Sequence, residues 1–259
     1  LLLTSYDDAP FSCVSPGEFA LYCEDQYQED GFPYVRFLNS TPVRWTLAVD
    51  LAIGQSCHVP AAMVYVPYFF AEEDGESPIV QRISTGLACH CSLAEAAVTA
   101  VCEVIERDAM TITWQAKLGM PQILNDTLSE ENRNLVRRFE RTGRLVTLLN
   151  ITLDHSVPTI LSVLRGQASD SPALVVAASS HLDPEQAVRK SLEELAHTHR
   201  MAQQITVSSP PMVPISNHAN VKTQDDHVHF YCNHANSYLA EFLFSSTQRL
   251  DFADIPGLA

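Results

Sequence analysis

Four carboxylates and an arginine lie within fourteen residues of an alanine- and valine-rich stretch, SLAEAAVTAVCEVIERDAM. At about 100° per residue of an α-helix, Glu95, Glu103 and Glu106 fall within an arc of about 80°. Carboxylates so grouped are hard oxygen ligands for Mg2+, which bridges a few carboxylates to substrate phosphates. The planar guanidinium of the adjacent Arg107 suits a phosphate oxygen pair. The spacing therefore indicates chemistry on a phosphorylated ligand held through Mg2+.

A structural interpretation of the same helix stays open. Small and branched apolar residues cover much of its opposite side: Ala94, Ala97, Val98, Val101, Ile105 and Ala109. If that side packs on a sheet, the acidic arc lies in water, and Ser92 with Glu95 forms a capping box. A solvated face usually mixes charges of both signs, because like charges one turn apart repel. The arc holds acids alone, and periodicity by itself does not decide between the two interpretations.

The amino-acid composition disfavours some classes of function. The chain has 259 residues, 46% of them apolar, and a net charge of −15. This balance disfavours a nucleic-acid surface, which needs clustered Lys and Arg. No window reaches the roughly 20 apolar residues of a membrane span, and the start lacks the features of a signal peptide. Seven scattered cysteines, an odd number, favour a reducing compartment, so we expect a cytoplasmic protein that does not contact membrane.

The elements that must position the acidic stretch follow from periodicity and turn residues. Strands are expected in 44–68 (two, around a Gly54-Gln55 turn), 145–154, 158–166 and 173–181, and helices in 92–116, 128–143, 183–204 and part of 225–246. Ser129 and Asp183 are the expected N-caps, with Pro184 in the first helical position. Residues 1–42 are expected to be loops with one short helix, 70–78 a solvated acidic loop, and 208–217 a linker. Consecutive strands without intervening helices predict an α+β fold with largely antiparallel strands packed against helices.

Several blocks in order resemble the YcaO superfamily. They are STGLACHCSLAEAAVTAVCEVIERDA, the preceding RWTLAVDLAIGQSCHVPAAMVYVPY, and the later RRFERTGRLVTLLNITLDHSVPTILSV and DPEQAVRKSLEELAHTHR. The resemblance runs through about residues 33 to 204 and more weakly to the end. It is strongest to the SagD-type thiazole/oxazole-forming cyclodehydratases. It implies a YcaO-type domain with a loop-rich entry segment (1–42), a core with the nucleotide-site helices (43–204) and a C-terminal part (205–259).

The resemblance also implies cofactors and site residues. YcaO enzymes bind ATP and Mg2+ between helices that carry conserved glutamates. The matching nucleotide-binding positions are Ser84, Gly86, Glu95, Glu103, Glu106, Arg107, Glu194 and His197, and the matching metal-binding positions are Glu95, Glu103 and Glu106. The catalytic residues are not identified. His197 stands where the family has Gln, and His90 stands where many relatives have glycine.

The family's upstream Glu-x-x-Glu-Arg block and its proline-rich tail have no match here. We therefore expect an incomplete domain that lacks both ends, and weak or no ATP binding and no activity by these 259 residues alone. ATP turnover by them would contradict that expectation.

The function implied is ATP- and Mg2+-dependent formation of azoline rings from Cys, Ser or Thr of a ribosomally made precursor peptide. The implied partners are that peptide, a protein resembling an adenylating enzyme, a flavin dehydrogenase and a second copy of the chain. Two alternatives stay open. One is amide activation to an amidine or thioamide, and the other is a non-catalytic scaffold with the same fold.

Three other groups could suggest chemistry. Cys89-His90-Cys91 lacks the further ligands of a zinc site. The histidines of HVHFYCNH (227–234) would share a face if they alternate on a strand, and could then bind a transition metal, although exposed histidines are the commoner case. Cys102 has no evident base and packs, and Asp154-His155-Ser156 lacks the nucleophile elbow of a hydrolase.

Overall fold

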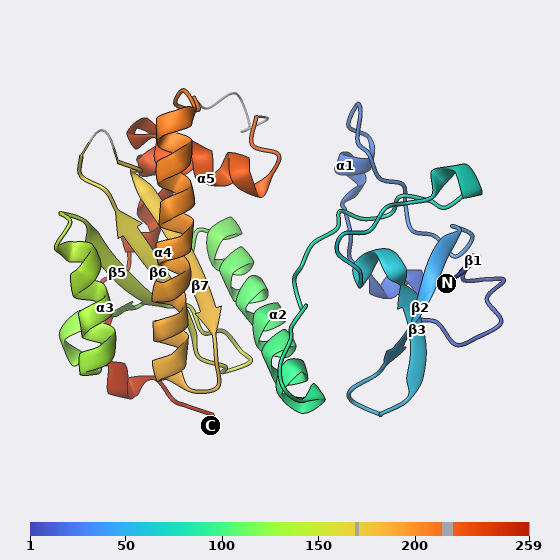
Figure 1. Ribbon diagram of the computed structural model, residues 1–259, viewed down its shortest axis with the longest axis horizontal. Helices are drawn as coiled ribbons and strands as arrows, with labels where there is room; N and C mark the ends of the chain where they lie inside the picture. The colour runs from blue at the N-terminus through green and yellow to red at the C-terminus, as the bar shows by residue number, and fades with distance from the viewer. Residues whose placement is uncertain (169–170, 214–219, 259) are drawn as a thin grey trace. The chain divides into compact units, whose positions relative to one another are not determined.

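The computed structural model describes residues 1–168, 171–213 and 220–258. The chain divides into two units, Leu1–Leu87 and Ala88–Ala259, and each is described by itself (Figure 1). The segment boundaries expected at 42/43 and 204/205 stay predictions. The linker expected over 208–217 lies partly outside the described residues, and the helix before it extends through Ser208.

The first unit is built on a three-stranded antiparallel sheet in the order β1-β2-β3. Its elements are β1 (Leu2–Thr4), the short helix α1 (Glu24–Tyr27), β2 (Val43–Val49), β3 (Ser56–Pro60) and single 3-10 turns at Pro16–Glu18, Ala61–Met63 and Glu72–Asp74. Gly54, with φ of 69°, closes the β2–β3 hairpin as the sequence predicts. The buried indole of Trp45 packs with Phe37, Val43 and Ile79.

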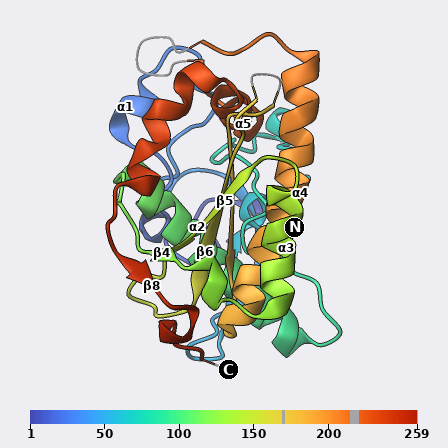
Figure 2. The same ribbon diagram turned by 90° about the vertical axis from the view of Figure 1, so that its left-hand side faces the viewer.

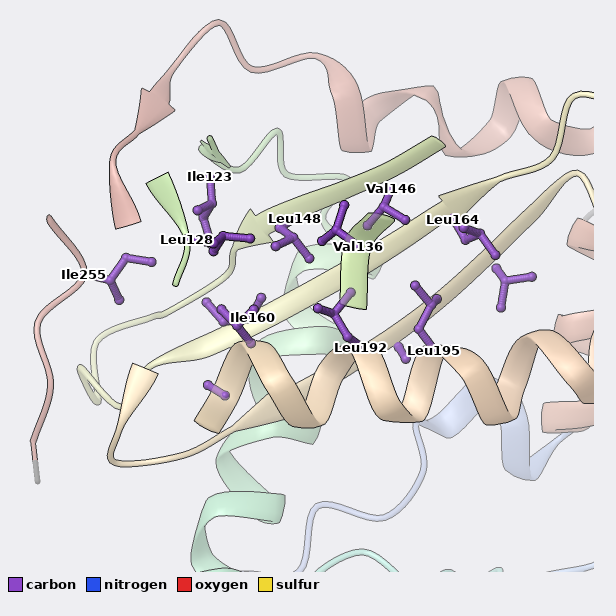
Figure 3. Close-up of a cluster of buried hydrophobic side chains, with 14 of the residues drawn as sticks. Ile123, Leu128, Val136, Val146, Leu148, Ile160, Leu164, Leu192, Leu195 and Ile255 are labelled. Carbon is purple, nitrogen blue, oxygen red and sulfur yellow. The ribbon is translucent and has the colours of Figure 1, made fainter. Parts of the chain in front are cut away.

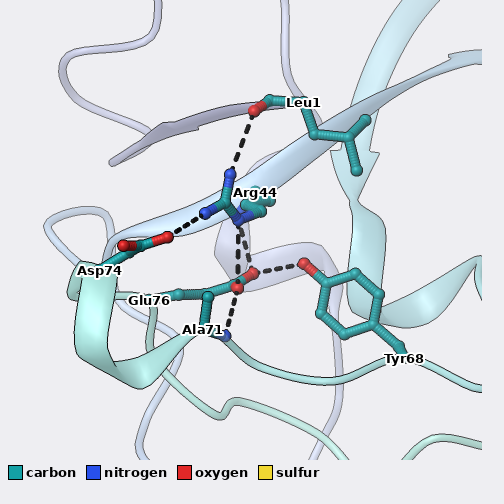
Figure 4. A network of polar contacts seen from close by, with 6 residues as sticks. All are labelled: Leu1, Arg44, Tyr68, Ala71, Asp74 and Glu76. Carbon is teal, nitrogen blue, oxygen red and sulfur yellow. Dashed lines mark hydrogen bonds and ion pairs between the residues drawn. The ribbon is translucent and has the colours of Figure 1, made fainter.

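The acidic loop of this unit differs from expectation. Glu76, in the segment 70–78 expected to be solvated, is only 3% exposed. Its carboxylate accepts hydrogen bonds from the Tyr68 hydroxyl and from the backbone N–H groups of Ala71 (3.0 Å) and Arg44 (3.3 Å). The Arg44 guanidinium lies 3.4 Å away and also pairs with Asp74 at 2.8 Å (Figure 4). Glu76 therefore ties the loop to β2, and the expectation was wrong for this residue.

The second unit holds a five-stranded sheet in the order β7-β6-β5-β4-β8. Its strands are β4 (Gln122–Ile123), β5 (Leu145–Asn150), β6 (Thr159–Arg165), β7 (Leu174–Ser180) and β8 (Arg249–Leu250). Its helices are α2 (Leu93–Gln115), α3 (Glu130–Glu140), α4 (Pro184–Ser208), α5 (Gln224–Cys232) and the 3-10 segments Asn125–Thr127, His234–Phe244 and Phe252–Asp254. Neighbouring strands are antiparallel except β4 and β8, which are parallel, so the α+β prediction is confirmed.

Helices cover both faces of this sheet. One face packs under α3 and α4, with Val136, Leu192 and Leu195 against the sheet residues Leu148 and Ile160 (Figure 3). The other face packs under the C-terminal part of α2 and the 3-10 segment His234–Phe244. Figure 2 shows β5 and β6 between α3 and α4 on one side and α2 on the other. The second unit therefore has a helix–sheet–helix layering, with β7 as an edge strand.

Candidate functional site

The acidic stretch forms α2 and starts at the predicted cap. Ser92 has extended backbone angles, and its hydroxyl oxygen accepts from the backbone N–H of Glu95 (3.3 Å). The Glu95 carboxylate accepts from the Ser92 hydroxyl (2.7 Å) and lies 2.9 Å from Nδ1 of His90. The hydrogen bond from Ser92, and then that from His90, lowers the pKa of Glu95. In this structure Glu95 thus stabilises the helix start, and no pattern in the sequence identified His90 as its partner.

Glu106 occupies a different environment on the same helix. Its side chain is 14% exposed, whereas that of Arg107 beside it is 50% exposed. One carboxylate oxygen accepts from the backbone N–H of Ser180, the last residue of β7, at 3.4 Å. The other lies 3.6 Å from the Arg107 guanidinium. Both contacts are long, so the carboxylate is withdrawn from water without close hydrogen-bond donors.

The electrostatics bring three of the predicted glutamates together. The pKa of Glu106 is raised to about 7: burial is the largest cause and the charges of Glu103 and Glu194 add to it, against the lowering effects of Arg107 and the Ser180 N–H. Glu103 lies on α2 and Glu194 on α4, so two helices contribute acids to one neighbourhood. A cation placed there would relieve the repulsion between these carboxylates.

Each of the other predicted residues has its own local surroundings. Glu95 precedes Glu106 by eleven residues, about 16 Å along a helix. His197 is exposed on α4. Ser84 and Gly86 belong to the first unit, where Leu87 N–H donates to the Ser84 carbonyl (2.9 Å) in a turn. Gly86 has φ of 82°, which favours glycine there. The roles of all these residues at a nucleotide site stay predictions.

The orientation of α2 contradicts the structural interpretation of its apolar side. The buried residues of α2 are Cys102, Ala109 and Thr113, which flank Glu106. Of the side expected to pack on a sheet, Ala109 is buried, but Val98 is 47% exposed and Val101 45% exposed. Small residues on the Cys102–Ala109 side allow α2 to approach β7 closely, and this places Glu106 at the strand end. An acidic arc lying wholly in water was therefore wrong for Glu106.

One cation near this neighbourhood was missed. Lys190, one helical turn before Glu194, lowers the pKa of Cys102 and that of His181, although burial is the larger effect on each. Burial raises the pKa of the Cys102 thiol, and the Glu106 charge raises it further, as a packing role requires. The i,i+4 spacing of Lys190 and Glu194 was the sequence signal that could have placed this cation near the acidic residues.

The histidines of 227–234 do not alternate on a strand, because they lie on the helix α5 and in the segment after it. The ring centroid of His227 lies 5.0 Å from that of Trp114 and 5.0 Å from that of Tyr231. Nε2 of His229 lies 2.9 Å from the Pro210 carbonyl oxygen, and that of His234 lies 3.0 Å from two other carbonyl oxygens. Each ring thus has its own neighbours instead of a shared ligand position.

Among residues 1–168, 171–213 and 220–258, no three His, Cys, Asp or Glu side chains converge on a position for a metal ion. Mg2+ does not require such a cage, because it is usually held by one or two carboxylates, several waters and the phosphates of its substrate. Glu103, Glu106 and Glu194 supply hard oxygen donors of the appropriate charge. The donor set therefore fits a magnesium–nucleotide complex better than a bare metal ion.

Residues 1–256 match the family of YcaO cyclodehydratases, which is described as binding ATP and Mg2+. The chain belongs to the YcaO family, and the resemblance stated from the sequence is confirmed.

Among curated proteins, an uncharacterized protein of Methanothermobacter thermautotrophicus is 32% identical over 160 residues, which are 60% of this chain and 41% of that protein. The chain thus spans about two fifths of the length of the curated relatives it matches.

Solved structures share the fold. A heterocyclase in complex with substrate and cofactor superposes with a TM-score of 0.79 and 19% identity, covering 99% of this chain and 34% of that one. YcaO from Methanopyrus kandleri bound with AMPPCP and Mg2+ has a TM-score of 0.59 and 21% identity, covering 82% and 50%. In the described part of the chain, no helix has the length and apolar character needed to span a membrane.

Proposed function

We propose that this chain is part of an ATP- and Mg2+-dependent cyclodehydratase that converts Cys, Ser or Thr of a ribosomally made precursor peptide to azoline rings. The observation that supports it best is the neighbourhood of Glu106. There a mostly buried carboxylate with long contacts lies near Glu103 and Glu194. Membership of the YcaO family gives this acidic neighbourhood a ligand class, a nucleotide with Mg2+.

The proposed chemistry turns an amide oxygen into a leaving group. The side-chain sulfur or oxygen of the peptide attacks the carbonyl carbon of the preceding residue, and its proton passes to solvent. The resulting oxyanion takes the γ-phosphoryl group of ATP, and ADP leaves. Loss of phosphate from carbon and of the proton from nitrogen then forms the C=N bond of the ring. The demand on the protein is to position the reactants and to stabilise phosphate charge.

Different residues of this chain would bind the metal ion and the phosphate groups. Glu103, Glu106 and Glu194 would hold Mg2+ through one or two direct carboxylate contacts, with the rest through water. Bound Mg2+ neutralises phosphate charge and orients the triphosphate. Arg107, half exposed beside Glu106, has free guanidinium donors for a phosphate oxygen pair. The Ser180 N–H fixes the Glu106 carboxylate at the end of β7.

The proposed partners follow from the same function: the precursor peptide, a protein resembling an adenylating enzyme that recognises it, a flavin dehydrogenase that oxidises azolines, and a second copy of the chain. An amidine or thioamide product requires added ammonia, amine or sulfide. Product mass separates these outcomes, because azoline formation removes one water per ring without incorporating a co-substrate.

Nucleotide binding by the full-length protein tests the site. A fluorescent ATP analogue is titrated with Mg2+ and with EDTA. We expect Glu103→Gln and Glu106→Gln each to weaken Mg2+-dependent binding about tenfold or more, since each removes a charged oxygen ligand. Glu193→Gln is the matched control, because Glu193 adjoins Glu194 but pairs with Arg189 at 2.9 Å. Unchanged binding by both test variants overturns the site.

A further inference from the structure

Basic residues concentrate at one end of α3 in an otherwise acidic chain. Arg133, Arg137, Arg138, Arg141 and Arg144 lie within twelve residues that contain one acid, Glu140. These are five of the sixteen Lys and Arg residues of a chain with net charge −15. Arg137, Arg138 and Arg141 are exposed, and we call these three the arginine face.

Hydrogen bonds to polar groups of the chain are formed by some of these arginines. Arg133 donates to the Asp126 carbonyl (3.0 Å) and Arg137 to the side-chain oxygen of Asn134 (3.3 Å). Within the described ranges of the chain, no carboxylate forms an ion pair with any of the five.

Three arginines elsewhere in the chain do form ion pairs with carboxylates. Arg36 pairs with Glu24, Arg165 with Glu241 at 3.4 Å, and Arg189 with Glu193 at 2.9 Å. Paired arginines are thus available in the same chain for comparison with the unpaired ones of α3.

The helix dipole explains this cluster only in part. Cations in the last turn of a helix gain roughly 0.3–1 kcal/mol each, which accounts for Arg137 and Arg138. However, Arg133, Arg137 and Arg141 follow one another at i,i+4 spacing, where like charges repel. The dipole does not favour a row of three cations, so their function is better sought in a partner.

We propose that the arginine face docks an extended acidic peptide segment with carboxylates at alternate positions. Side chains four residues apart on a helix are separated by about 6 Å along its axis, and alternate side chains of an extended peptide by about 6.6 Å. Successive carboxylates can therefore meet Arg137 and Arg141. Each pairing uses the planar fork that binds carboxylate oxygens in pairs. A uniformly charged nucleic acid is disfavoured by repulsion from the net charge of −15.

This inference does not rest on the proposed nucleotide site, since no residue of α3 belongs to it. The test uses the full chain and a fluorescein-labelled ten-residue peptide of alternating Glu and Ser, followed by fluorescence anisotropy at low and at physiological salt. The test variant is Arg137→Gln/Arg138→Gln/Arg141→Gln. The matched control is Arg36→Gln/Arg165→Gln/Arg189→Gln, which removes the same charge from arginines that form ion pairs.

The test variant should bind the alternating peptide about tenfold more weakly, and the control should bind within about twofold of the unaltered chain. A peptide of the same composition with its five glutamates in one block should bind more weakly than the alternating one. Mg2+–nucleotide binding should be the same in both variants. Equal losses in test and control would reduce the effect to net charge, and no loss in the test variant would also overturn the proposal. If a ten-nucleotide oligothymidylate binds more tightly than the alternating peptide, the proposal is overturned in favour of a nucleic-acid ligand.

Discussion

Glu76 in the first unit and Glu106 in the second are both withdrawn from solvent, but their partners differ. The Glu76 carboxylate accepts hydrogen bonds from the Tyr68 hydroxyl and from two backbone N–H groups, and it forms an ion pair with the Arg44 guanidinium. Glu106 has one N–H at 3.4 Å and one guanidinium nitrogen at 3.6 Å, and other acids lie nearby. Burial alone therefore does not distinguish an anchoring carboxylate from one at a binding site.

The completeness of the partner set does distinguish them. A buried carboxylate with all its oxygens satisfied stabilises the fold around it, and removal of the charge leaves its donors unpaired. A carboxylate that retains free acceptor positions and repels its neighbours costs stability in the empty protein. Such a cost is expected at sites that bind a cation, because the ligand removes the repulsion. Glu76 belongs to the first kind and Glu106 to the second.

The largest expected effect comes from Glu76→Gln. The substitution removes the charge that Arg44 and the Tyr68 hydroxyl contact, and we expect the first unit to lose about 3 kcal/mol of unfolding free energy. Hydrogen exchange of the β2 amides measures this unit separately, with the β6 amides of the second unit as an internal reference. Glu73→Gln, an exposed acid in the same loop, is the control and should change little. If the β2 amides exchange equally fast in both variants, Glu76 does not anchor the loop to β2.

Glu106→Gln should act in the opposite direction and depend on pH. Since burial raises the pKa of Glu106 to about 7, above its ordinary value of 4.5, the folded chain holds this proton more tightly than the unfolded chain. The resulting stabilisation is fully present below about pH 4.5 and is lost as pH rises through about 7. Glutamine does not titrate. The variant should therefore gain about 2 kcal/mol relative to the unaltered chain between pH 5 and pH 8.

Urea unfolding in EDTA, followed by circular dichroism at each pH, measures this difference. A Glu106→Gln difference that stays constant from pH 5 to pH 8 would show that Glu106 is not held in a charge-disfavouring environment. The nucleotide-binding result is separate, because it is measured with Mg2+ present.

Local signals in the sequence predicted the elements that carry the site. Ser92, Ser129 and Asp183 cap their helices as expected, since a side-chain oxygen before an apolar run satisfies the first free N–H groups. Gly54 closes the predicted hairpin. These features depend on neighbours a few residues away, and such neighbours are visible in the sequence.

Long-range packing was not visible in the same way. Glu76 was assigned to water because its partner Arg44 lies 32 residues earlier, on β2. The parallel pairing of β4 with β8 joins strands of two residues each, too short for any periodic signal. The side of α2 that packs could not be chosen because alanine and cysteine on one side compete with valine on the other. The family resemblance identified Glu106 as a site residue. Its burial could not be predicted, because it depends on packing against the end of β7.

The smallest expected effect refines the partner set of Glu76. Tyr68→Phe removes one hydroxyl donor while Arg44 and the Ala71 N–H remain, so we expect a loss of about 1 kcal/mol in the first unit, less than for Glu76→Gln. Burial and the adjacent Glu76 raise the pKa of Tyr68, so the hydroxyl keeps its proton as a donor. Tyr65→Phe is the matched control, because the Tyr65 hydroxyl contacts the Thr46 hydroxyl at 3.0 Å on a half-exposed ring. Exchange of the β2 amides should rank the variants as Glu76→Gln, Tyr68→Phe and Tyr65→Phe. A loss in Tyr68→Phe as large as that in Glu76→Gln would mean that the hydroxyl, and not the Arg44 guanidinium, dominates this anchor.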